Sequence, residues 1–244
     1  MRYGIFSDIH SNLEALEAVL DFYKKQKINQ FFCIGDIVGY GDNPTECIPI
    51  IQELLCPTVA GNHDWAVIEK FSLEYFNSYA KEAIIWTKGV LSSEEKSFLD
   101  SLRLVYQDKE LTSVHSSLDA PSEFFYIDNL DSALRCFSYL ETSLCFVGHS
   151  HIPVVFILDR ANNLSYFSDN SFEINLDKDK RYIINVGSVG QPRDRDYRAG
   201  ACIYDTEEKT VSFRRIVYDV ASSAKKIIKA GLPSFLAQRL FLGR

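Results

Sequence analysis

Three short apolar runs in the first 60 residues constrain the fold of this 244-residue chain more than any other feature. They cover residues 2–7, 31–34 and 58–60, and the first two are followed by segments with helical spacing of apolar residues, at 12–25 and 43–55. Apolar runs of this length that alternate with amphipathic helices indicate parallel strands in a layered α/β sheet.

Each of these runs ends in residues that can bind a metal ion. Asp8 and His10 follow the first run, Asp36 follows the second, and Asn62 and His63 follow the third. Ligands of open α/β sheets gather at the carboxyl ends of the strands, so we expect these side chains to lie together. The chain has only five histidines, and the remaining three also follow strand-like runs: His115, His149 and His151.

The residue types and spacings favour a catalytic metal site. Carboxylate, imidazole and amide ligands suit Zn, Mn, Fe or Ni, and the lack of cysteine in the clusters argues against a structural zinc. Asp8 and His10 are two residues apart, so both can reach one ion, and His149 and His151 repeat this spacing. Asp36 follows a glycine and can bridge two ions about 3.5 to 4 Å apart. Any one of these residues alone would more often be a helix cap, a turn residue or a core histidine; their joint occurrence favours the metal.

The rest of the chain predicts one domain over residues 1–244, without a linker or a repeat. Residues 65–102 have a helical pattern rich in aromatic side chains, and we interpret them as a lid. Beyond this segment short strands dominate, interrupted by a helix near 130–140, and helices at 220–229 and 234–241 close the chain. The expected strands cover 112–115, 144–147, 154–158, 164–167, 181–186, 200–204 and 211–216. This number of elements indicates two packed sheets with helices outside.

Composition excludes several other classes of protein. The net charge of −7 opposes binding to a nucleic-acid backbone, so no stable nucleic-acid partner is expected. No run of about 18 apolar residues and no signal peptide occur, so we expect a soluble, cytoplasmic protein with no membrane partner. The six cysteines are far apart and without CxxC spacing, which predicts reduced thiols.

Five segments resemble, in order and spacing, the motifs of the calcineurin-like metallophosphoesterases. A sixth segment, at 185–194, resembles one found in the small prokaryotic members of that family. The resemblance implies an α/β fold of the four-layer αββα type, in which helices flank two packed mixed β-sheets. The five motifs are Asp8-Ile9-His10, Gly35-Asp36-Ile37-Val38-Gly39, Gly61-Asn62-His63-Asp64, Val114-His115 and Gly148-His149-Ser150-His151.

The same resemblance implies a centre of two divalent ions, with Mn as the expected metal and Fe, Zn, Ni or Co as the other options. A hydroxide that bridges the ions would attack phosphorus in line. Asp36 would be shared by both ions. The first ion would be bound by Asp8, His10, Asp36 and His151, and the second by Asp36, Asn62, His115 and His149.

Two further residues of the third motif are implied to be catalytic. His63 would protonate the leaving oxygen or stabilise its charge, and Asp64 would orient His63. The alternative for His63 is a buried structural imidazole.

The phosphate-binding residues are less directly indicated. The protein serine/threonine phosphatases of that superfamily and the bacterial symmetric diadenosine tetraphosphatases carry Asp-Arg-Gly after the second motif. This chain reads Val38-Gly39-Tyr40-Gly41, so the arginine is missing. We expect Arg193 and Arg198, together with Asn62, to bind substrate phosphate, because guanidinium groups recognise phosphate in a bidentate manner. The alternative is a solvated loop of mixed charge. Aromatic residues of 65–102 could stack on a nucleobase, but plain core packing is favoured by their helical spacing.

These observations predict a binuclear metal-dependent phosphoesterase that hydrolyses small phosphodiesters, phosphomonoesters or nucleotides. Alternatives are a dinucleoside polyphosphate hydrolase or a protein serine/threonine phosphatase, and, outside the enzymes, a catalytically silent metal-binding scaffold. The expected partner is a small phosphorylated substrate. The sequence does not determine the oligomeric state, and a homo-oligomer is one alternative.

Overall fold

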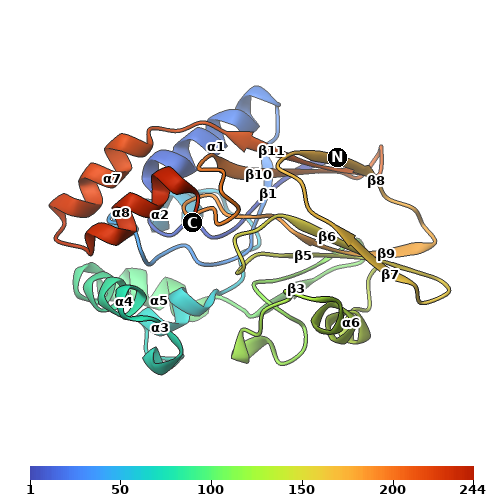
Figure 1. Cartoon of the computed structure of the whole chain (residues 1–244), viewed down its shortest axis with the longest axis horizontal. Coiled ribbons are helices and arrows are strands. Elements are labelled where there is room, and N and C mark those ends of the chain that lie inside the picture. Colours follow the sequence, from blue (N-terminus) through green and yellow to red (C-terminus); the bar gives the residue numbers. More distant parts are fainter.

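The computed structural model describes residues 1–244 and contains two mixed β-sheets flanked by eight α-helices (Figure 1). Strands β1 and β2 pair in parallel, whereas β1 and β10 are antiparallel. The first sheet has the order β2 (Gln30–Cys33), β1 (Arg2–Phe6), β10 (Ala199–Asp205), β11 (Thr210–Ile216) and β8 (Phe172–Asn175). The second has the order β3 (Val105–Gln107), β4 (Thr112–Val114), β5 (Leu144–Val147), β9 (Lys180–Asn185), β6 (Val154–Asp159) and β7 (Leu164–Phe167).

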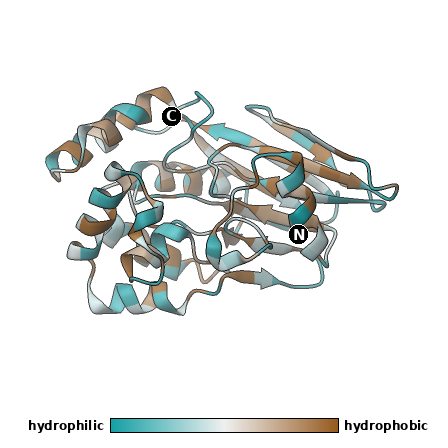
Figure 2. Cartoon of the chain, turned by 60° about the horizontal axis from the view of Figure 1, so that its bottom comes forward, coloured by the Kyte–Doolittle hydropathy of each residue, from teal (hydrophilic) through white to brown (hydrophobic).

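The helices cover the outer faces of the sheets. Helix α1 packs on β10 and β11, and α6 packs on β7 and β9 (Figure 1). Figure 2 shows hydrophobic and hydrophilic segments on the same helices, as expected for helices with one buried face. The helices are α1 (Leu13–Lys25), α2 (Pro44–Glu53), α3 (Asn62–Val67), α4 (Ser78–Val90), α5 (Ser93–Ser101), α6 (Leu130–Tyr139), α7 (Val220–Lys229) and α8 (Ser234–Leu242).

Consecutive strand residues alternate between separate hydrophobic cores, which produces the four layers. In β1, Ile5 faces the core between the two sheets, and Phe6 faces the core beneath the helices that cover the first sheet. In β5, Phe146 faces the core between the sheets, while Cys145 faces the core beneath α6. Alternate side chains of a strand point to opposite faces, so both faces of each sheet are buried. The predicted αββα sandwich is confirmed.

Several expected elements differ from the structure. Residues 58–60 form only isolated bridges, Thr58 with Cys33 and Val59 with Arg103, so the expected third strand is wrong. Strands β3 and β8 were not predicted, because three or four residues with little burial give almost no periodic signal. The expected helices are confirmed, and Ser92 and Glu95 form a capping box at the start of α5.

All six cysteines are free, and five of them are buried. None of the helices combines the length and the apolar character that a membrane span requires.

Candidate metal centre

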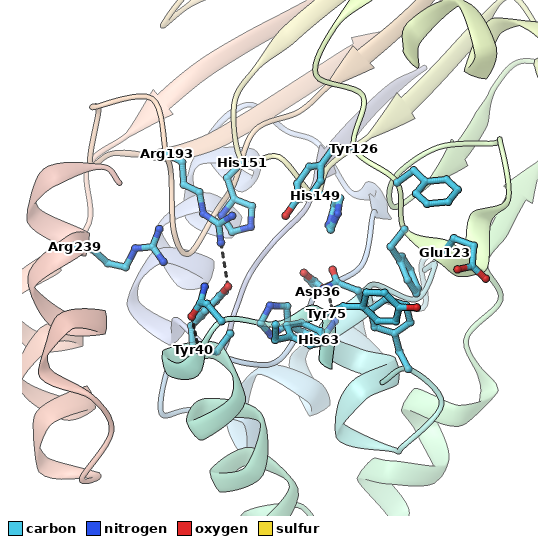
Figure 3. Close-up of a pocket in the computed structure, with 17 residues that line it drawn as sticks. Asp36, Tyr40, His63, Tyr75, Glu123, Tyr126, His149, His151, Arg193 and Arg239 are labelled. Carbon is cyan, nitrogen blue, oxygen red and sulfur yellow. Dashed lines mark hydrogen bonds between the residues drawn. The ribbon is translucent and has the colours of Figure 1, made fainter. Parts of the chain in front are cut away.

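Strands of both sheets have their carboxyl ends at one site. Asp8 follows β1 and Asp36 follows β2, which belong to the first sheet. His115 follows β4, and both His149 and His151 follow β5, in the second sheet. The side chains of Asp36, His149 and His151 converge on one cavity in Figure 3. The site therefore lies where the two sheets meet.

Five of the predicted ligands have left-handed backbone conformations, which are uncommon for residues other than glycine. Such conformations persist only where the surrounding structure enforces them, and they cluster at functional sites. Here they turn the chain sharply at the strand ends. The φ angles are 55° at Asp8, 50° at His10, 50° at Asp36, 67° at His149 and 61° at His151.

Two glycines leave the space that the carboxylates occupy. A Cβ atom at Gly61 would lie 2.0 Å from Oδ1 of Asp36, and one at Gly148 would lie 2.5 Å from Oδ2 of Asp8. Backbone N–H groups fix the same carboxylates: His63 donates to Asp36 (2.9 Å), and His149 donates to Asp8 (3.1 Å).

The predicted ligands form two groups that share Asp36. Within each group the ligand atoms lie within 4.8 Å of one another, and every member is buried. One group is Asp8, His10, Asp36 and His151, and the other is Asp36, His115 and His149. The structure thus brings together the residues that were assigned to each ion, apart from Asn62.

The imidazoles of His10 and His151 show that these residues fit a cation. Nδ1 of His10 lies 3.1 Å from the carbonyl oxygen of Val38, and Nδ1 of His151 lies 2.5 Å from that of Gln191. A carbonyl oxygen only accepts, so each Nδ1 carries the proton and each Nε2 presents a lone pair. The two Nε2 atoms face each other at 3.1 Å, beside the carboxylates. A cation between these atoms would convert repulsion into coordination.

The protonation states of the four ligand histidines also favour a bound cation. Burial lowers the pKa values of His10, His149 and His151 well below the ordinary value, so these imidazoles are neutral, the form that binds metals. Burial also opposes charge on His115, but the nearby carboxylates, Asp36 foremost, outweigh it and raise the pKa of His115 to about 9. The pocket therefore attracts positive charge.

The third motif occupies the floor of the site. Oδ1 of Asn62 is buried without a hydrogen-bond partner and is free to coordinate a cation. The His63 ring lines the cavity, 4.8 Å from the His10 ring and 4.4 Å from the Tyr40 ring, centroid to centroid. Burial lowers the pKa of His63 to about 4. An anionic phosphate beside the ring would raise that pKa, because it favours the imidazolium.

The expected contact between Asp64 and the His63 ring does not occur. The Asp64 carboxylate accepts hydrogen bonds from the backbone N–H groups of Ile37, Val38 and Gly61, at 2.9 to 3.2 Å. Asp64 therefore ties the loop of the second motif to the start of α3 and supports His63 only indirectly.

A cavity of about 380 Å³ opens over the site (Figure 3). Of the two predicted phosphate-binding arginines, Arg193 lines it. Arg198 does not line the cavity, because its guanidinium is paired with the Asp196 carboxylate, at 2.6 Å.

Sequence reasoning missed several lining residues, among them Tyr40, Tyr126 and Arg239. Tyr40 lies between two glycines of the second motif, and that spacing could have drawn attention to it. Tyr126 stacks on His149 with ring centroids 4.0 Å apart, and Arg239 reaches the cavity from α8. No local pattern marks either of these two residues.

Only part of the aromatic segment reaches the cavity. Phe71, Tyr75 and Phe76 line it, whereas Trp65 and Trp86 do not. Residues 71–80 thus form one wall, and the lid interpretation of 65–102 stays a prediction.

Comparison with known proteins agrees with this site. A family model described as the calcineurin-like phosphoesterase superfamily domain matches residues 1–209. An uncharacterized protein of Methanocaldococcus jannaschii is 46% identical over 247 residues, covering 99% of this chain and 98% of that protein.

Solved structures show the same architecture. A metallophosphoesterase from Sphaerobacter thermophilus has a TM-score of 0.87 and 38% identity, covering 100% of this chain and 99% of that one. A hypothetical protein from Pyrococcus horikoshii has a TM-score of 0.81 at 19% identity, with 100% and 98% covered, and supports the fold alone.

Proposed function

Because this chain belongs to the calcineurin-like phosphoesterase superfamily, we propose that it is a binuclear metal-dependent hydrolase of small phosphodiesters, phosphomonoesters or nucleotides. One observation carries the proposal. Two neutral imidazoles, of His10 and His151, direct lone pairs at each other beside two buried carboxylates. Without a bound cation, the repulsion between these lone pairs and the cost of burying the two carboxylates would not be offset.

Two sets of side chains would bind the ions, with Asp36 common to both and Mn as the proposed metal. Divalent ions bound there would lower the pKa of a water molecule and offset the charge of the phosphate. The first set is Asp8, His10, Asp36 and His151, and the second is Asp36, Asn62, His115 and His149.

Other residues of the cavity would bind and orient the phosphate ester. The Arg193 guanidinium lines the cavity and would donate hydrogen bonds to phosphate oxygens. The His63 ring lies beside the His10 ring and would donate a proton to the oxygen of the leaving group. Aromatic side chains of the 71–80 wall would exclude water from one side of the bound ester.

Removal of metal should inactivate the protein, and metals that prefer nitrogen ligands should restore it best. After treatment with a chelator and dialysis, hydrolysis of bis(4-nitrophenyl) phosphate should fall to background. Added Mn, Ni or Co should restore more activity than Mg, because imidazole binds the softer ions better. Metal analysis of the reconstituted protein should find two ions per chain. A single ion per chain, or full activity with Mg alone, would refute the binuclear nitrogen-rich centre.

A further inference from the structure

Two arginines from distant parts of the chain meet over one tyrosine in the cavity. Arg193 lies in the loop between β9 and β10, and Arg239 lies on α8 (Figure 3). Their guanidinium carbons are 5.6 Å and 5.8 Å from the centroid of the Tyr40 ring. Arg239 lies beyond the residues that the family model matches, so the family motifs do not account for it.

No Asp or Glu side chain pairs with either arginine, in contrast to two other cations of the same part of the fold. Arg198 pairs with Asp196, and Lys226 pairs with Glu14. Burial, together with the charge of Arg193, lowers the pKa of Arg239 to about 10. Two like charges that share a cavity repel one another unless an anion lies between them.

The hydrogen bonds of the two guanidiniums leave donors for such an anion. Arg193 donates to the Tyr40 hydroxyl (3.3 Å) and to Oε1 of Gln191 (3.0 Å), and its buried Nε has no partner. Arg239 donates through Nε to the main-chain oxygen of Arg244. The Tyr40 hydroxyl is also within hydrogen-bonding reach of the Arg239 guanidinium, whose side chain points toward the cavity in Figure 3.

The Tyr40 ring fixes how far this arginine pair lies from the metal centre. Its centroid is 4.7 Å from that of the His10 ring and 4.4 Å from that of the His63 ring. An anion at the pair would therefore lie next to the reacting phosphate, within the same cavity. Two guanidiniums and a hydroxyl supply the charge and the donors that a phosphoryl group requires.

We propose that Arg239, together with Arg193, forms a second anion subsite, so that the preferred substrate carries a second phosphoryl group close to the one that is hydrolysed. This assignment rests on the proposed function, because the first subsite is the metal centre. Arg239 is the better test residue, since Arg193 also faces the metal centre.

Binding of phosphonates that cannot be hydrolysed tests the subsite without turnover. By calorimetry, Mn-loaded wild-type protein should bind methylenediphosphonate more tightly than methylphosphonate. Arg239→Gln should weaken diphosphonate binding about 10- to 100-fold, as expected for loss of one charged hydrogen-bonding group, and leave methylphosphonate binding nearly unchanged. Arg239→Lys should retain part of the preference. Lys229→Gln, a loss of the same charge on the exposed surface of α7, should bind as wild type.

Kinetics separates failure of the subsite from failure of the proposed function. Arg239→Gln should lower kcat/KM for a nucleoside diphosphate by a similar factor and leave that for bis(4-nitrophenyl) phosphate nearly unchanged. Equal effects of Arg239→Gln on diphosphonate and monophosphonate binding, or none on either, would overturn the second subsite. If wild-type protein hydrolysed no phosphate ester while Arg239→Gln still lost diphosphonate preference, the proposed function would fail and the anion subsite would stand.

Discussion

Asp36→Asn should abolish hydrolysis and lower the metal content below two ions per chain while the fold is retained. Asp36 is the only side chain common to both ligand groups, so one substitution should weaken metal binding by both groups. The asparagine oxygen can still accept the hydrogen bond from the backbone N–H of His63, which keeps the third motif in place. Metal analysis and the rate with bis(4-nitrophenyl) phosphate measure the two effects, and circular dichroism reports the fold.

The matched control is Asp169→Asn, the same chemical change at an exposed position away from the cavity. It should keep both ions and full activity. If the Asp36→Asn variant kept full activity and bound two ions, Asp36 would not bridge the metal ions.

His63→Ala should impair substrates with poor leaving groups far more than substrates with good ones. General acid catalysis typically contributes a factor of about 100 to 10,000, and nitrophenolate leaves without that assistance. We therefore expect a loss of that size for a nucleotide diester and a smaller loss for bis(4-nitrophenyl) phosphate. Both ions should remain bound, because His63 belongs to neither ligand group.

His63→Asn keeps a polar side chain in the same space and separates proton donation from packing. The His63 ring contacts the rings of Tyr40 and Phe76, so the alanine variant also removes packing. If both variants lost equal activity on both substrates, together with metal or thermal stability, His63 would be structural.

Most of the metal ligands could be predicted because they lie in short motifs at the ends of strands, whereas Asn62 follows only the isolated bridges of Thr58 and Val59. Asp8 and His10 follow β1 directly, so the local chain alone places them at the sheet edge. Two packed sheets with helices outside were predictable from the number of short apolar runs, such as 144–147, which is buried throughout and matches the strand β5. The four-layer αββα type was implied by the family resemblance.

The remaining parts of the site depend on contacts between distant residues. Arg239 reaches the cavity only because α7 and α8 pack together over the first sheet, and nothing in its neighbourhood indicates this. Asp64 was assigned to the wrong partner, since adjacency to His63 in sequence does not reveal that its carboxylate turns toward the loop at 37–38. Arg198 was likewise assigned to phosphate, because the sequence does not reveal that its guanidinium pairs with the Asp196 carboxylate.

The origin of the ligands in two different sheets makes bound metal a crosslink within the fold. Asp8 and Asp36 extend from one sheet, and His115 and His149 extend from the other, so separation of the sheets must release the ions. A ligand that binds only the folded state adds about 2.7 kcal/mol of stability at a free concentration 100 times its Kd. The melting temperature should therefore rise with free Mn, and the supply of metal would govern how long the folded protein survives as well as whether it is active.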